Sequence, residues 1–319
     1  MDKTAIIILN FNNYEDTINC IESVEKYNSA PIKLIIVDNA STRSDALPSL
    51  ENYLRQKYEN DFCKFTDLIS DGTAEELVLP YCSLIASDIN DGYAKGNNKG
   101  LRLSFLDKTI KNILILNNDI LFVEDIIPSL TGLLDSIPNV GIVSPVLYKK
   151  GLKSIDFNCA RKDMPIVDAI LNRLFTRFLR HINYNDKLYM LKNKSSQSEI
   201  VEIELPSGSC MLLRKDLFRE IGLFDPNTFL YYEENILYRK MQEKHLHNYL
   251  CTSLKCIHLG ASSTSKSPSM LIVDAGIHSG NYYYENYYPC SITMVRLYKL
   301  SNIFHRICVK MQKLLTGKK

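Results

Sequence analysis

Two adjacent carboxylates, Glu233 and Glu234, are the residues of this sequence best suited to acid–base chemistry. They come directly before a run with helical periodicity. Neighbouring carboxyl groups push each other's proton affinities apart, which allows one of them to accept a proton near neutral pH. Acidic residues are also common in the first turn of a helix, where they complement its positive end. The pair alone therefore leaves a catalytic role and a capping role open.

Polar side chains stand at the ends of three apolar runs that we expect to form strands. The runs, each with the polar residues that follow it, are 5–9 with Asn10, 33–37 with Asp38 and Asn39, and 112–116 with Asn118 and Asp119. Ligands of open α/β sheets bind outside the carboxyl ends of the strands, so these side chains are expected to converge on one cleft. Asn and Asp also open turns after strands, and this second explanation stays open.

A glycine-rich segment, 90–100, is a third candidate for ligand binding. It contains Asn90, Gly92 and Asn97, and we expect a loop that leads into a helix at Leu101. Glycines allow a backbone to come close to a ligand. The segment matches neither GxGxxG nor a Walker pattern, which argues against a dinucleotide site or a P-loop.

The elements that must position these residues alternate along the first half of the chain. Helical periodicity at 14–27 and around 47–54 separates the apolar runs, and 83–86 is a further expected strand. Strands that are apolar throughout and alternate with helices predict an α/β fold, with a mainly parallel central sheet flanked by helices. With 319 residues, 45% of them hydrophobic and 23% charged, the chain can build a large core, and a wholly disordered class is excluded.

Nine scattered cysteines without a CxxC pair argue against a zinc site and against a disulfide framework. They favour a reducing, cytosolic setting. The apolar run 5–9 is too short for a signal sequence, and no run approaches the length of a membrane span. We therefore expect a cytoplasmic protein.

A basic segment between 150 and 200 lies outside this pattern and is amphipathic. Its apolar stripe consists of Leu171, Leu174, Phe175, Phe178, Leu179 and Ile182, with Arg173, Arg177 and Arg180 alongside. The periodicity favours a helix packed on the core with a solvated basic flank. An acceptor-side or membrane-facing element is the alternative.

A second basic, amphipathic stripe lies after Glu285, where acidic residues stop and seven Lys or Arg follow. It consists of Leu297, Leu300, Phe304, Ile307, Met311 and Leu314. The pattern predicts an interfacial amphipathic helix attracted to an anionic membrane surface, with a core-packing helix or a dimer seam as the alternatives. The tyrosines before it, 282–284 and 287–288, form either an aromatic wall near an acceptor or part of the core.

Together these motifs resemble glycosyltransferase family 2, a group of nucleotide-sugar enzymes with the GT-A fold, and within it the bacterial rhamnosyltransferase-like branch. The resemblance extends from residue 4 to about 264. Its motifs are the strand ends 8–13 and 37–42, the segment 90–100, Asn117-Asn118-Asp119 at the family's metal-binding DxD position, and the segments 207–212, 221–225, 229–234 and 258–263.

The resemblance implies a role for each candidate residue. Those that would bind the nucleotide-sugar donor are Asn10, Asp38, Asn39, Asn90, Gly92, Asn97 and Asn118. Asp119 and His258 would bind a divalent metal, Mg²⁺ or Mn²⁺. Glu234 occupies the position of the catalytic base, with Glu233 as its tuning or orienting neighbour. Without the resemblance, a lone histidine such as His258 is interpreted as structural.

The implied reaction is the inverting, metal-dependent transfer of a sugar from a nucleoside-diphosphate sugar to a hydroxyl of a lipid-linked glycan, in bacterial surface polysaccharide synthesis. We expect it to take place at the inner face of the cell membrane, without nucleic acid, and a homodimer is left open. An inactive nucleotide-sugar-binding relative and a sugar nucleotidyltransferase are the alternative functions.

The expected organisation is a GT-A catalytic domain at 1–264, followed by a Tyr-rich segment and a basic amphipathic helix at 265–319. The catalytic domain would divide into a nucleotide-binding half, 1–120, and an acceptor half, 121–264. A basic helical insertion at about 150–200 would belong to the acceptor half.

Overall fold

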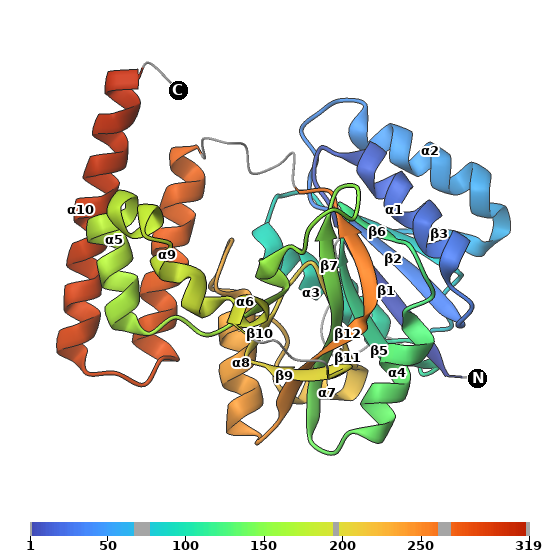
Figure 1. Ribbon diagram of the computed structural model, residues 1–319. Helices are drawn as coiled ribbons and strands as arrows, with labels where there is room; N and C mark the ends of the chain where they lie inside the picture. The colour runs from blue at the N-terminus through green and yellow to red at the C-terminus, as the bar shows by residue number, and fades with distance from the viewer. Residues whose placement is uncertain (1, 67–76, 194–197, 261–268, 317–319) are drawn as a thin grey trace.

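A central mixed sheet runs through the molecule, whose computed structural model describes residues 2–66, 77–193, 198–260 and 269–316 (Figure 1). The strands of this sheet are, in spatial order, β3 (Phe62–Thr66), β4 (Cys82–Ala86), β2 (Ile32–Asp38), β1 (Lys3–Asn10), β5 (Ile110–Asn117), β11 (Cys210–Arg214), β7 (Val140–Lys149), β12 (His247–His258) and β6 (Ile120–Phe122), with β9 (Ile200–Ile203) beside β12. The strands from β3 to β5 are parallel, and so are β7 and β12. Antiparallel pairing of β11 with β5 and β7 joins these two parallel parts.

Helices cover both faces of the sheet. One face carries α1 (Tyr14–Tyr27), α2 (Ala46–Tyr58) and α4 (Ile127–Ser136), and the other carries α3 (Gly92–Phe105), α7 (Lys215–Glu220) and α8 (Glu233–Glu243). Within β1, Ile6 and Ile8 belong to the first core and Ile7 to the second, because successive side chains of a strand point to opposite faces. This double burial explains why the strand is apolar throughout, and the predicted α/β class is confirmed.

The predicted elements of the first half are confirmed, apart from the start of one helix. The apolar runs lie in β1, β2, β4 and β5, and the helical runs form α1 and α2. The segment 90–100, however, is not a loop that becomes helical at Leu101, because α3 already begins at Gly92. A Cβ on Gly96 would lie 2.7 Å from Leu9 Cδ1, and one on Gly100 would lie 2.6 Å from Ile7 Cγ2. These two glycines let α3 pack closely on the sheet.

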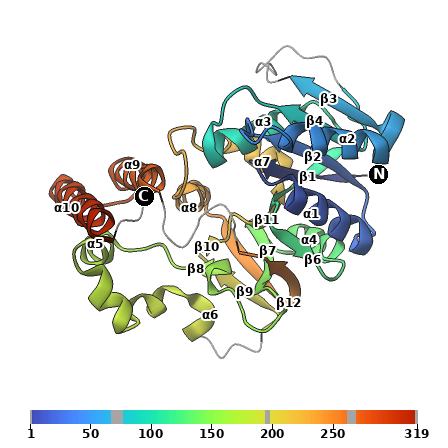
Figure 2. The same ribbon diagram turned by 90° about the horizontal axis from the view of Figure 1, so that it is seen from above.

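Three helices form a separate layer beside the sheet, which we call the helical unit: α5 (Ile166–His181), α9 (Met270–Asn286) and α10 (Ile292–Thr316) (Figures 1 and 2). Its core joins α8 and consists of Ile166, Ala169, Ile236, Tyr283, Tyr284 and Tyr298. Tyr283 and Tyr284 are therefore core residues and form no wall of an open site. The remaining short elements are β8 (Ala160–Arg161) paired with β10 (Leu205–Pro206), α6 (Met190–Asn193), and the 3₁₀ turns η1 (Glu59–Asp61), η2 (Phe157–Cys159) and η3 (Tyr184–Leu188).

The apolar stripe of α5 does not pack on the core as predicted. Ile166, Ala169 and Leu179 face inward, whereas most of the predicted stripe is exposed, namely Leu174, Phe175, Phe178 and Ile182. The reason is that α5 lies at the outside of the helical unit (Figure 2) and packs mainly against α10 and η3. No helix within the described ranges is both long and apolar enough to cross a membrane.

Candidate active site

The loops after β1 and β2 are tied together by a buried pair, Asn10 and Asp38. Asn10 Nδ2 donates to Asp38 Oδ1 at 2.7 Å, and Asn10 Oδ1 accepts from Thr17 Oγ1 at 3.0 Å. Ser41 completes the cluster, since its Oγ and backbone N donate to the two oxygens of Asp38 at 2.6 and 3.1 Å. Both oxygens of Asp38 therefore already accept hydrogen bonds from the protein, which fixes the conformation of the two loops after β1 and β2. We call these two loops the rim. A direct contact of Asp38 with a donor nucleotide remains a prediction.

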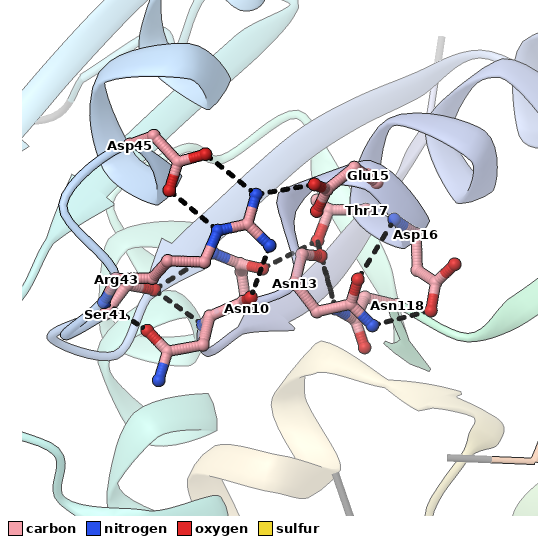
Figure 3. Close-up of polar contacts among 10 residues, drawn as sticks. Asn10, Asn13, Glu15, Asp16, Thr17, Ser41, Arg43, Asp45 and Asn118 are labelled. Carbon is pink, nitrogen blue, oxygen red and sulfur yellow. Dashed lines mark hydrogen bonds and ion pairs between the residues drawn. The ribbon is translucent and has the colours of Figure 1, made fainter. Parts of the chain in front are cut away.

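Arg43 organises the outer part of the same rim and was not predicted from the sequence. Its guanidinium binds Asp45 at 2.7 Å and Glu15 at 2.5 Å (Figure 3). It also lies 4.8 Å from the ring centroid of Tyr14. Asn12 Oδ1 holds the backbone by accepting from the Arg43 N at 2.8 Å. These exposed groups give the loop a fixed path, and an arginine in a polar loop carries no sequence signal for such a role.

Asn39 connects this rim to the start of α3. Its Nδ2 donates to Asn90 Oδ1 at 2.9 Å and to the Gly92 carbonyl at 3.1 Å. Gly92 has a φ of +76°, and a Cβ there would lie 2.1 Å from the Phe229 carbonyl oxygen. The first turn of α3 is therefore pressed against the loop that leads to Glu233. This position, unlike Gly96 and Gly100, requires glycine for its backbone conformation.

The two asparagines inside α3 have different partners. Asn97 is buried and its Nδ2 donates to the Tyr93 carbonyl at 3.0 Å, within the helix. Asn98 exchanges two hydrogen bonds with the backbone of Phe224, at 2.9 and 3.1 Å. Asn98, which the sequence reading passed over, thus anchors the loop between α7 and α8. The donor-binding role of Asn97 remains a prediction.

Asp119 and His258, the predicted metal ligands, lie next to each other. His258 Nε2 is 3.3 Å from Asp119 Oδ2, and His258 Nδ1 is 2.8 Å from Asp156 Oδ2. The residue before Asp119, Asn118, donates to the Asn13 carbonyl and to Thr17 at 3.2 and 3.1 Å, which ties the end of β5 to α1 (Figure 3). Asp156 was not predicted, because it lies in a segment without a recognisable pattern.

This pair fits a divalent cation, although in the described part of the chain no group of three or more His, Cys, Asp or Glu is arranged to hold one. Asp119 Oδ1 is buried and has no hydrogen-bond partner among the described residues. An unpartnered buried carboxylate oxygen is costly unless a ligand satisfies it. Burial lowers the pKa of His258, but the hydrogen bonds to Asp119 and Asp156 outweigh this effect and raise that pKa to about 9. His258 would therefore have to lose this proton before its Nε2 could bind a cation.

Glu233 and Glu234 open α8 and have different surroundings. Glu233 is buried, and burial, followed by the charge of Glu234, raises its pKa to about 8. Glu234 keeps 19% of its side chain exposed, and its Oε1 accepts a hydrogen bond from the Gly208 backbone N at 3.0 Å. Arg161 approaches the same oxygen to 3.9 Å, while its Nε is buried and has no partner in the described structure. The accessible member of the pair is Glu234.

The loop before the pair is held in an unusual conformation by the helical unit. Tyr231 and Tyr232 both have positive φ, 72° and 73°, which non-glycine residues rarely adopt. Tyr232 stacks on Tyr283, with ring centroids 5.4 Å apart, and its hydroxyl is 3.1 Å from that of Tyr298. This packing stabilises the strained turn that presents the two carboxylates.

The segment after β10 connects the region of Asp119 with that of Glu234. Asn117 N donates to the Ser209 carbonyl at 2.9 Å, and Asn117 Nδ2 is 3.2 Å from Ser209 Oγ. The preceding residue, Gly208, carries the N–H that binds Glu234. Hydrogen bonds of Asn117, two residues before Asp119, and of Gly208 therefore connect the end of β5 to Glu234 through the segment 208–209.

Comparisons with known proteins place this architecture in a recognised fold. No protein-family model matches the sequence. The chain is 24% identical over 259 residues to the low-salt glycan biosynthesis hexosyltransferase Agl10 of Haloferax volcanii, which covers 81% of this chain and 67% of that protein.

Two solved glycosyltransferase structures share the fold. GalNAc-T7 with UDP, GalNAc and Mn²⁺ superposes with a TM-score of 0.58 at 11% identity, over 95% of this chain and 55% of that one. The chain thus spans about half the length of GalNAc-T7. The Pyrobaculum calidifontis mannosyltransferase PcManGT, in complex with GDP-Man and Mn²⁺, superposes with a TM-score of 0.53 at 11% identity, over 99% of this chain and 76% of that one. The fold of the chain is GT-A.

Proposed function

We propose that this chain is a glycosyltransferase that moves a sugar from a nucleoside-diphosphate sugar to a hydroxyl group of an acceptor. The observation that carries the proposal is the hydrogen-bonded connection from Asn117, at the end of the strand before Asp119, to Glu234 through the segment 208–209. Asp119, the proposed cation ligand, and Glu234, the partly exposed carboxylate, would then face one donor and one acceptor from the same edge of the sheet. The sequence similarity to a hexosyltransferase supports glycosyl transfer.

A divalent metal, Mg²⁺ or Mn²⁺, would be held by Asp119 and His258. When bound, it would supply positive charge for the diphosphate of the leaving nucleotide. Both solved structures with this fold contain Mn²⁺. The DxD position has a single carboxylate here, so the Oδ1 atom of Asp119 and the imidazole of His258 would have to supply the binding.

Glu234 would act as the general base. Its partly exposed carboxylate can accept the proton of an acceptor hydroxyl while that hydroxyl attacks the sugar. Attack from the face opposite the leaving nucleotide inverts the anomeric centre. Glu233 would act through its neighbour, because it is buried and cannot itself meet an acceptor.

The finer assignments are also proposals. We infer membership of glycosyltransferase family 2 from the motifs, and a lipid-linked glycan acceptor at the inner face of the membrane from the basic amphipathic segments. The related hexosyltransferase is named for glycan biosynthesis in an archaeon, which supports a glycan product. The rhamnosyltransferase-like branch and the bacterial surface polysaccharide are supported by the sequence motifs alone.

The proposal is tested by incubating purified protein and Mn²⁺ with a panel of UDP-, GDP- and dTDP-sugars. We expect one donor to raise the melting temperature and to release its nucleoside diphosphate, faster when a lipid-linked acceptor is added. Stabilisation by a donor without any release identifies an inactive binding protein. Release of pyrophosphate from a nucleoside triphosphate and a sugar phosphate identifies a nucleotidyltransferase instead.

A further inference from the structure

We propose that α5 and α10 together form one face that binds an anionic lipid bilayer, and we call it the lipid face. Its α10 part is the apolar stripe at Leu297, Leu300, Phe304, Ile307, Met311 and Leu314, whose side chains are 46% to 76% exposed. Burying such side chains in the interfacial region of a bilayer is favourable in proportion to their apolar area. The stripe therefore has the composition of a membrane-contacting surface.

The outward stripe of α10 is not needed for packing, because the helix packs through its opposite side. Val295, Tyr298, Ser301 and Asn302 are buried against α5 and α9. A helix that is packed through one side and is apolar again on its free side carries apolar surface that the fold does not use. This excludes the core-packing helix for the stripe.

The second part of the lipid face comes from α5, far away in the sequence. Leu174, Phe175, Phe178 and Ile182 are 38% to 62% exposed, and α5 packs beside α10 (Figures 1 and 2). Most large hydrophobic side chains that are exposed among the described residues belong to the helical unit. Scattered exposed leucines are ordinary, but such a concentration on neighbouring helices marks an interaction surface.

Charge selects an anionic bilayer as the occupant. Arg177 and Arg180 on α5, and Arg296 and Lys310 on α10, form no ion pair with the described residues. The acids that α9 offers nearby, Asp274 and Glu285, are already paired with Arg306 and Lys299. In a homodimer through this face, two like positive charges would meet. Anionic headgroups instead complement the positive charge of these side chains.

The inner side of the same helical unit contacts the loop 229–232, which leads to Glu233. Ser279 Oγ donates to the Leu230 carbonyl at 3.0 Å, and Gly280 lies so close to Tyr232 that a Cβ would be 3.0 Å from its ring. Docking of the lipid face would therefore set the orientation of Glu234 relative to the bilayer. This consequence rests on the proposed function, because only a lipid-borne acceptor gives that orientation a use.

The test is cosedimentation of the full chain with vesicles of phosphatidylcholine alone or with about 30% phosphatidylglycerol. We expect binding to the anionic vesicles only. The double variants Phe175→Ser/Phe178→Ser on α5 and Phe304→Ser/Ile307→Ser on α10 should each weaken it at least tenfold. Val78→Ser, at a 73% exposed valine outside the helical unit, is the matched control and should bind normally.

Binding that the α5 variant leaves unchanged would overturn the two-helix face, and equal binding to both kinds of vesicle would overturn its charge selectivity. A stable dimer in sedimentation velocity, lost in both double variants and without vesicle binding, would identify a second copy as the occupant. The measurement needs no donor sugar. A chain that binds anionic vesicles but turns over no donor would thus refute the proposed function and leave the lipid face intact.

Discussion

Glu234 Oε1 accepts a hydrogen bond from the backbone N–H of Gly208 at 3.0 Å, and this contact fixes the one accessible carboxylate of the pair. The Gly208 carbonyl in turn accepts from Tyr93 Oη at 2.6 Å, so the backbone at this point is held from both sides. If Glu234 is the base, as proposed, it loses little conformational freedom in the reaction, because its position is set before the acceptor arrives.

Replacing Glu234 with Gln should abolish most of the transfer activity and leave the fold intact. The amide oxygen of Gln can still accept from Gly208, but it cannot take up the proton of an acceptor hydroxyl. We expect kcat to fall by roughly 10²–10⁴-fold, the usual contribution of a general base, with donor affinity unchanged. Steady-state kinetics and a thermal-shift titration with donor measure the two quantities. Glu220→Gln, at an exposed acid on α7, is the control, and an equal loss in both variants would contradict the assignment.

Replacing Gly208 with Ala should lower kcat with little effect on stability. The added Cβ would lie 2.8 Å from Glu234 Oε1 and 2.9 Å from Tyr93 Oη, so the carboxylate must move. Both atoms are ends of side chains and can shift without disturbing the core. Misplacement by about 1 Å can cost about 10²-fold in rate. Chemical denaturation and kinetics on one preparation separate the two effects, and a normal kcat would mean that the carboxylate position is not critical.

Much of the fold could be predicted because burial leaves a clear pattern in the first half of the chain. Ile6, Ile7 and Ile8 are buried on both faces of β1, and a short β-branched apolar run of this kind is typical of a fully buried strand. The prediction of a loop at 90–100 was wrong because the glycines at 92, 96 and 100 are spaced four residues apart. This spacing places them on one face of a helix. Strand β12 was harder to predict from the sequence. Its pairing with β7 shifts register between Cys251 and Lys255, which interrupts the alternation of inward and outward side chains.

The site was predictable only in part. The adjacency of Asp119 and His258 followed from the motif resemblance, not from any periodicity. Asp156 and Arg161 could not be predicted as site residues. Their contacts, with His258 and Glu234, join residues about 100 and 70 positions apart in the sequence, and no local pattern encodes such contacts. The packing of α5 depended on how much of the helix the rest of the chain covers, and the hydrophobic stripe alone cannot reveal that.

Replacing Asp119 with Asn should remove the stabilisation of the protein by Mn²⁺. The amide offers one neutral oxygen where the carboxylate offers a charged one, and a hard cation prefers the latter. We expect the rise in melting temperature with Mn²⁺ to disappear in Asp119→Asn and to shrink in His258→Ala. Isothermal titration with Mn²⁺ and a nucleoside diphosphate provides the affinities. Asp135→Asn, at an exposed acid paired with Arg214, should respond like the wild type.

Glu233 should make the protein less stable as the pH rises from about 5 to 8. Its pKa is raised to about 8 in the folded state, while an unfolded chain ionises it near its ordinary value of 4.5. In this window the folded state keeps a proton that the unfolded state has lost, so increasing pH favours unfolding, and the effect levels off above pH 8. One pKa unit corresponds to about 1.4 kcal/mol, so several kcal/mol are at stake. Urea denaturation of wild type and Glu233→Gln at pH 5 to 9 should show the downward slope in the wild type only, after subtraction of the shared background.

Replacing Gly280 with Ala should weaken the contact between the helical unit and the loop 229–232, which leads to Glu233. A Cβ at this position would lie 2.5 Å from Tyr298 Oη and 3.0 Å from the Tyr232 ring, both of which are packed in the core. Overpacking of this kind typically costs about 1–3 kcal/mol. Because Tyr232 shapes the turn before Glu233, kcat should fall together with the free energy of unfolding.

A double-mutant cycle with Tyr298→Phe tests this explanation. Removing the Tyr298 hydroxyl gives up its 3.1 Å contact with Tyr232, so the single variant should be modestly less stable. It also removes the atom that an alanine at 280 would strike first. The double variant Gly280→Ala/Tyr298→Phe should therefore be more stable than the sum of the two single effects predicts. If the stability losses of the two single variants were strictly additive, α9 would move away from the loop 229–232 without displacing Tyr232. In that case kcat would be insensitive to the packing of the helical unit.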